Sequence, residues 1–90
     1  MAELDVQIVA SDHAVWQGKA NEITARTVEG AVGILPGHTP MLALLGEGEV
    51  VIKSVESGTV KAHASGGFFS VDDDDKVTIV ADDADLTTEA

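Results

Sequence analysis

The sequence predicts one all-β domain, folded as a β-sandwich or a small barrel. Segments that alternate apolar and polar residues recur at spacings of about 8–12 residues, and turn-forming residues separate them. No segment shows the apolar periodicity of a convincing helix. Hydrophobic residues make up 44% of the 90-residue chain, which is enough for one compact core and hence for one domain at most.

The expected strands begin near the N-terminus, where Leu4, Val6 and Ile8 alternate with polar neighbours. A short second strand is expected to end at Gly18. Aromatic residues make up only 3% of the chain, so the core-facing sides of the strands must be mainly aliphatic. The expected strands cover residues 4–8, 15–16, 20–27, 49–55, 59–64, 68–71 and 76–81.

Two stretches lack a clear strand pattern. Residues 41–45 are entirely apolar, so a short helical turn is an alternative to a strand, although five residues are too few for a stable helix. Residues 82–90 are acidic and contain Leu86 as their one large apolar residue. We expect this tail to be frayed or to be the start of a linker.

The charge balance limits the classes of partner. Sixteen Asp and Glu against five Lys and Arg give a net charge of −11, which argues against binding to nucleic acid or directly to anionic lipid. The chain has no cysteine, which excludes disulfides and thiolate metal sites. It also has no secretory signal and no apolar run of membrane-spanning length. The expectation is a soluble, cytosolic protein that is at most peripheral to a membrane.

No arrangement of residues indicates catalysis, a metal or a cofactor. His13, His38 and His63 share no ligand spacing, so scattered surface histidines are favoured over a three-histidine site. The run of aspartates at 72–75 could in principle bind Ca²⁺, but it lacks the EF-hand spacing and is interpreted as a solvated turn. The residues therefore favour a non-enzymatic β domain.

The most constrained backbone lies in residues 30–40, which contain both prolines of the chain. Gly33, Pro36 and Gly37 are predicted to shape a structural turn there. The apolar residues of this stretch, Val32, Ile34 and Leu35, have two interpretations. They are either exposed as a docking surface or buried in the core.

Residues 29–40, EGAVGILPGHTP, resemble the hallmark segment of the epsilon subunit of F-type ATP synthases. The resemblance covers about residues 4–84 and includes VWQG at 15–18, LALLGEG at 42–48, SGGF at 65–68 and VTIVAD at 77–82. It implies a flattened β-sandwich of about ten strands. It also implies a non-catalytic rotor subunit in the central stalk that links the gamma subunit to the membrane c-ring and couples proton translocation to ATP synthesis. Such a subunit is peripheral, at the cytoplasmic face of the plasma (inner) membrane.

The resemblance also implies which residues meet the partners. Many members of the family carry a carboxylate where this chain has Ala31, so a ring contact through that charge is not expected here. The expected c-ring side is formed by Val28, Glu29, Gly30 and Ala31, and the expected gamma or ring side by His38, Thr39, Pro40, Met41 and Leu42.

Family members usually continue into an inhibitory α-helical hairpin. We therefore expect residues 1–84 to form the epsilon-type domain and residues 85–90 to be an acidic tail or the stub of that hairpin, unable to inhibit ATP hydrolysis. Two other classes of protein are alternatives. One is a lipoyl- or biotinyl-type carrier modified at Lys76, and the other is a metal-dependent cupin enzyme, for which clustered ligands are missing.

Overall fold

The computed structural model describes residues 3–37, 39–56 and 58–87, and these residues form nine β-strands and no helix. The all-β prediction is therefore confirmed. The strands are β1 (Leu4–Ala10), β2 (Ala14–Thr27), β3 (Gly30–Ile34), β4 (Met41–Leu44), β5 (Gly48–Ser54), β6 (Gly58–Ser65), β7 (Phe68–Val71), β8 (Lys76–Ala81) and β9 (Asp83–Leu86).

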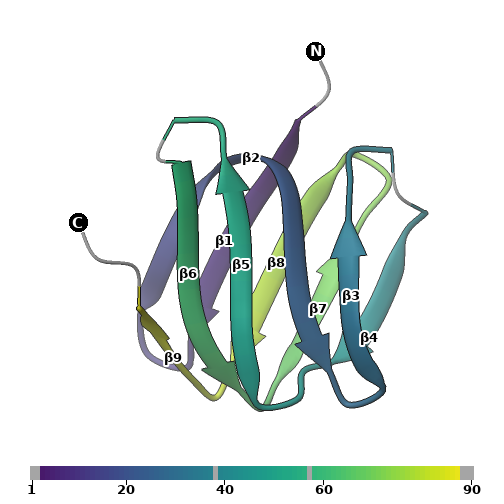
Figure 1. Cartoon of the computed structure of the whole chain (residues 1–90). Helices are drawn as coiled ribbons and strands as arrows, with labels where there is room; N and C mark the ends of the chain where they lie inside the picture. The colour runs from purple at the N-terminus through teal and green to yellow at the C-terminus, as the bar shows by residue number, and fades with distance from the viewer. Residues whose placement is uncertain (1–2, 38, 57, 88–90) are drawn as a thin grey trace.

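One hydrogen-bonded sheet folds over itself into two layers because β2 belongs to both (Figure 1). The first half of β2 pairs with β1, whereas the second half lies between β3 and β5. The register shifts between Ala20 and Glu22, which is where the strand passes from one layer to the other. One layer has the order β4-β7-β8-β1-β2 and the other β3-β2-β5-β6-β9, so counting β2 twice gives the ten strand segments of a sandwich. The flattened shape measures 32 × 30 × 22 Å.

The core between the layers is aliphatic, as predicted, with Phe69 as the one aromatic side chain that is fully buried in the described residues. The apolar residues of the hallmark segment show both predicted outcomes, burial in the core and exposure. Ile34 is buried in the core, Leu35 is exposed, and Val32 is half-buried against the core. The largest buried aliphatic side chains are Leu4, Ile8, Ile23, Ile34, Ile52 and Ile79.

The prediction that a strand ends at Gly18 is wrong. β2 runs through this residue, which pairs with Val6 of β1. A Cβ atom on Gly18 would lie 2.8 Å from the ring of Trp16, so the glycine makes room for the indole rather than forming a turn.

Both unclear stretches contain strands. β4 pairs with β7, which excludes the helical turn considered for residues 41–45. β9 pairs with β6 and buries Ala84 between exposed aspartates, so the tail is not frayed over this segment. β9 extends to Leu86, and the division of the chain after residue 84 stays a prediction.

Candidate functional site

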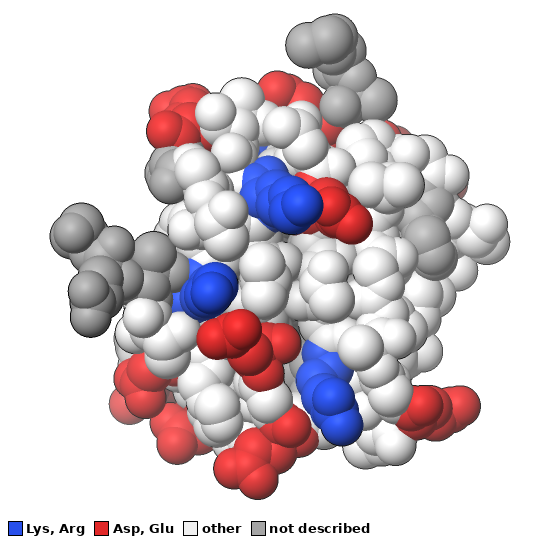
Figure 2. All heavy atoms as spheres, in the orientation of Figure 1, with Lys and Arg blue, Asp and Glu red and all other residues white. Residues whose placement is uncertain are grey.

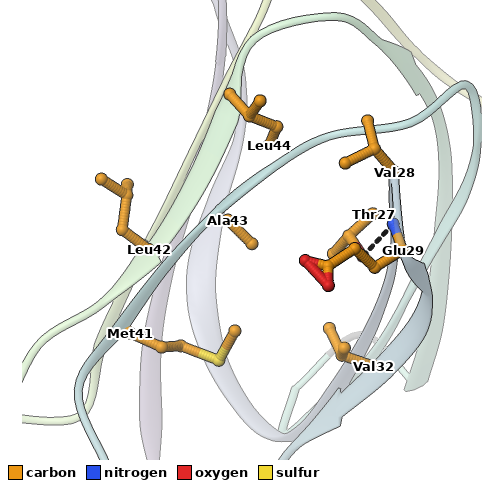
Figure 3. A pocket seen from close by; sticks show the side chains of 8 residues that line it. All are labelled: Thr27, Val28, Glu29, Val32, Met41, Leu42, Ala43 and Leu44. Carbon is orange, nitrogen blue, oxygen red and sulfur yellow. Dashed lines mark hydrogen bonds between the residues drawn. The ribbon is translucent and has the colours of Figure 1, made fainter.

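One side of the sandwich is open between β3 and β4 (Figure 1). Within the described residues, β3 pairs only with β2 and β4 only with β7, so each strand is the edge of its layer. A groove of about 380 Å³ lies between these edges (Figure 3). It is lined by Thr27, Val28, Glu29, Val32, Met41, Leu42, Ala43 and Leu44.

The turn from β2 to β3 forms one wall of the groove and is held by Thr27. The pair Thr27↔Gly30 leaves Val28 and Glu29 as a two-residue turn, and Gly30 has a φ of 126°. The Thr27 hydroxyl donates to the Gly30 carbonyl at 2.7 Å and accepts from the Glu29 N–H at 3.2 Å. Because Thr27 is buried, these bonds fix the turn rigidly and hold Val28 and Glu29 in place.

Replacing Thr27 by valine is expected to destabilise the domain by about 1–3 kcal/mol, because both partners of the hydroxyl lose their bond while the shape is kept. Urea unfolding followed by Trp16 fluorescence measures this loss. Thr27→Ser retains the hydroxyl and is the control, with an expected loss of about 1 kcal/mol or less. Equal losses in the two variants would show that the hydroxyl does not hold the turn.

β4 forms the other wall and is bonded to the turn across the open side. The Val28 N–H donates to the Leu44 carbonyl at 3.1 Å, and the Gly46 N–H donates to the Arg26 carbonyl at 3.0 Å. Met41 and Ala43 pack against the core, whereas Leu42 and Leu44 alternate with them and are exposed. Figure 3 shows the Glu29 carboxylate directed into the groove from the wall opposite Met41 and Ala43.

Large apolar side chains are exposed together around this groove. Val28 is 65% exposed, Leu42 71% and Leu44 63%, and Phe68 lines a second hollow with both leucines. We call Val28, Leu42, Leu44 and Phe68 the apolar edge. A cluster of exposed large apolar side chains at an open edge is typical of a protein–protein interaction site. Charged side chains lie on the neighbouring face of β2, β5 and β6 (Figure 2).

The structure places most of the predicted site residues and adds others. Val28 and Glu29, expected on the c-ring side, meet Met41 and Leu42, expected on the gamma or ring side, in one groove. The remaining predicted residues do not line it: Gly30 and Ala31 lie in β3, Thr39 and Pro40 are exposed in the loop at the far end of β3, and His38 lies outside the described residues. Of the residues predicted to shape the structural turn, Pro36 and Gly37 lie in a turn after β3, but Gly33 lies inside β3 and pairs with Thr24, so that part of the prediction is wrong. Sequence reasoning missed Thr27, Leu44 and Phe68 as parts of the site. Because residues 41–45 are entirely apolar, no alternation in the sequence distinguishes exposed Leu44 from its neighbours.

Comparison with known proteins decides the family. The beta-sandwich domain described as "ATP synthase, Delta/Epsilon chain" matches residues 3–87. The chain belongs to the ATP synthase delta/epsilon family. This finding confirms the resemblance stated from the sequence and agrees with the two-layered fold.

Relatives of this delta/epsilon chain are named ATP synthase epsilon chain. The one from Micrococcus luteus is 58% identical over 86 residues, covering 96% of this chain and 93% of the relative. The one from Streptomyces griseus is 47% identical over 88 residues, covering 98% of this chain and 70% of the relative.

Solved structures of ATP synthases contain the same fold. A chain of the Euglena gracilis mitochondrial ATP synthase, solved as an OSCP/F1/c-ring assembly, superposes with a TM-score of 0.87 at 28% identity. The match covers 96% of this delta/epsilon chain but about half, 54%, of the Euglena chain. A chain from the central stalk and c-ring of the Tetrahymena thermophila enzyme gives a TM-score of 0.74 at 22% identity, covering 90% of this chain and 64% of that one, and shows the fold alone.

The alternative sites considered for this delta/epsilon chain lie away from the groove. His13 contacts Asp12 at 2.6 Å in the turn before β2, and this hydrogen bond lowers the pKa of the Asp12 carboxyl. His63 is exposed on β6 and lies 4.0 Å from Glu47. Carboxylate oxygens of Asp72, Asp73 and Asp74 lie within 4.8 Å of one another in an exposed turn, and Lys76 follows them at the start of β8.

Proposed function

We propose that this chain is a non-catalytic rotor subunit of an F-type ATP synthase, linking the gamma subunit to the c-ring. The observation that carries the proposal is the exposed apolar edge beside an open groove, found in a domain of the ATP synthase delta/epsilon family. Exposed side chains of this size are stabilised by burial against a partner, at about 25 cal/mol per Å² of apolar surface. A permanent place in an assembly gives them that burial.

The groove favours a partner segment with a defined chemistry. Leu42, Leu44 and Phe68 offer apolar contact, and the Glu29 carboxylate lies among apolar lining residues. An apolar gamma segment that carries a basic side chain would cover the leucines and pair with Glu29. Pairing of this kind sets register and specificity more than affinity. The turn of Val28 and Glu29, continuing into Gly30 and Ala31 of β3, is the proposed contact with the c-ring. The loop that leads through Thr39 and Pro40 into β4 is the proposed contact with gamma or the ring.

The proposed role is mechanical. A close-packed aliphatic core deforms little, so the sandwich can hold gamma and the ring in a fixed relation during rotation. Nucleotide chemistry is assigned to other subunits. The described part of the chain contains no helix long and apolar enough to cross a bilayer. We place the chain at the cytoplasmic face of the plasma membrane, held there through the complex.

Reconstitution tests this function. The full chain is added to the same organism's ATP synthase depleted of this subunit, in vesicles energised by a proton gradient. We expect restored proton-driven ATP synthesis, saturating at about one copy of the chain per complex, because rotation must be transmitted from the ring to gamma. Failure to bind the depleted complex, or binding without recovery of coupling, would contradict the proposal.

A further inference from the structure

The turn between β7 and β8 holds an aspartate in a strained conformation. Asp75 has a φ of 60° and is the one non-glycine residue with positive φ among the described residues. This left-handed region is costly for a residue with a Cβ atom and is open to glycine without that cost. A glycine would form the turn at lower cost, so the side chain of Asp75 is the feature to explain.

The turn itself is held without the Asp75 carboxylate. The Asp72 carboxylate accepts from the N–H groups of Asp74 at 2.9 Å and of Lys76 at 3.0 Å. The Asp72 N–H donates to the Lys76 carbonyl at 3.0 Å, and the Asp75 carbonyl accepts from the N–H of Asp5 at 2.9 Å. The Asp75 side chain is therefore available for a contact outside its own turn.

That contact is with the loop between β3 and β4. Asp75 Oδ1 accepts a hydrogen bond of 2.7 Å from the backbone N–H of Gly37, which is 38 residues away in the sequence. The β3–β4 loop and the β7–β8 turn lie side by side at one end of the sandwich (Figure 1). A short bond from a carboxylate to a backbone N–H is among the stronger hydrogen bonds of proteins.

We propose that Asp75 is a positioning residue that fixes the β3–β4 loop in the conformation required for binding the rotor partner. The inference rests on the proposed function. Gly37 itself has a φ of 86°, and the loop continues through Thr39 and Pro40 into Met41, which lines the groove. Asp75 thus connects β1, through its carbonyl, to the loop that follows β3, through its carboxylate. Preorganising a binding loop raises affinity because less freedom is lost on binding.

Three variants of the full chain separate the effect of the Asp75 side chain from the effect of its backbone conformation. Asp75→Gly removes the acceptor and also removes the backbone strain of the positive φ. Asp75→Asn keeps an acceptor oxygen, and asparagine tolerates this conformation. Asp73→Gly is the matched control, because it removes one exposed charge from the same turn. Within the described part of the chain, the Asp73 side chain makes no hydrogen bond. Each variant is measured by hydrogen exchange of the Gly37 amide and by affinity for the purified gamma subunit.

We expect Asp75→Gly to speed Gly37 exchange at least about tenfold and to weaken gamma binding by about 3- to 10-fold. Asp73→Gly is expected to stay within about twofold of the wild type in both measurements, and Asp75→Asn, which keeps an acceptor oxygen without the charge, is expected to fall between Asp75→Gly and the wild type. Unchanged Gly37 exchange in Asp75→Gly would overturn the contact, and faster exchange with unchanged affinity would overturn the positioning role. If the wild-type chain itself fails to bind gamma, the proposed function fails, and Gly37 exchange still reports on the contact separately.

Discussion

Replacing Gly67 by alanine is expected to lower the free energy of unfolding by more than about 3 kcal/mol. Gly67 has a φ of 87°, and an added Cβ atom would overlap the carbonyl oxygen of Val80 and lie 2.9 Å from the Cα of Ala81. These are backbone atoms of β8, and Val80 pairs with Phe68, so β7 and β8 would have to separate. The Gly67 carbonyl also accepts from the N–H of Leu45, which ties the end of β4 to this point.

Gly58 supplies the matched control for this substitution. Its φ is 69°, but an added Cβ atom would meet nothing within 4 Å. Gly58→Ala is therefore expected to cost only about 1 kcal/mol, the penalty of the left-handed backbone alone. Urea unfolding followed by Trp16 fluorescence compares the two variants. Similar losses would contradict the close approach of β8 to Gly67.

Replacing Leu44 by aspartate is expected to weaken binding to the gamma subunit by about 100-fold or more, while the free energy of unfolding changes by less than about 1 kcal/mol. Leu44 is exposed in the isolated chain, so a charge is tolerated there. In the complex the same carboxylate would be buried among apolar groups and close to Glu29, at a high desolvation cost. Titration calorimetry with purified gamma measures the affinity.

Val55→Asp is the control for the apolar edge. Val55 is also a large, exposed apolar residue, but it follows β5 and its N–H bonds to the Lys19 carbonyl, away from the groove. The variant introduces the same charge and is expected to bind gamma within about twofold of the wild type. If Val55→Asp weakens binding as much as Leu44→Asp, the effect is one of net charge and the assigned surface is wrong.

The alternation of apolar residues predicted most of the strands because each layer has one buried face. β1, β5, β6 and β8 follow this rule closely. The rule failed for β9, where Ala84 is the one buried side chain in a short acidic strand, and pairing with β6 decides the structure. It also misjudged Gly18, because the packing of Trp16 over the glycine is not visible in the period of the sequence.

The candidate site was harder to predict than the strands, because it depends on contacts between segments that are far apart in the sequence. The hallmark segment identified the region, but the split between buried Ile34 and exposed Leu35 needed the register of β3 on β2. The groove exists because β4 pairs with β7 in one layer while β3 pairs with β2 in the other. Neither this arrangement nor the bond between Asp75 and Gly37 follows from local patterns, since both join residues far apart in the sequence.

Cross-linking within the assembled enzyme tests the docking surface most directly. A photoreactive amino acid in place of Leu44 is incorporated into the full chain, and the chain is assembled into the depleted ATP synthase and irradiated. We expect a covalent product with the gamma subunit from this position and none from the same group in place of Val55. A product with gamma from position 55 and none from position 44 would contradict the assignment of the apolar edge as the rotor contact.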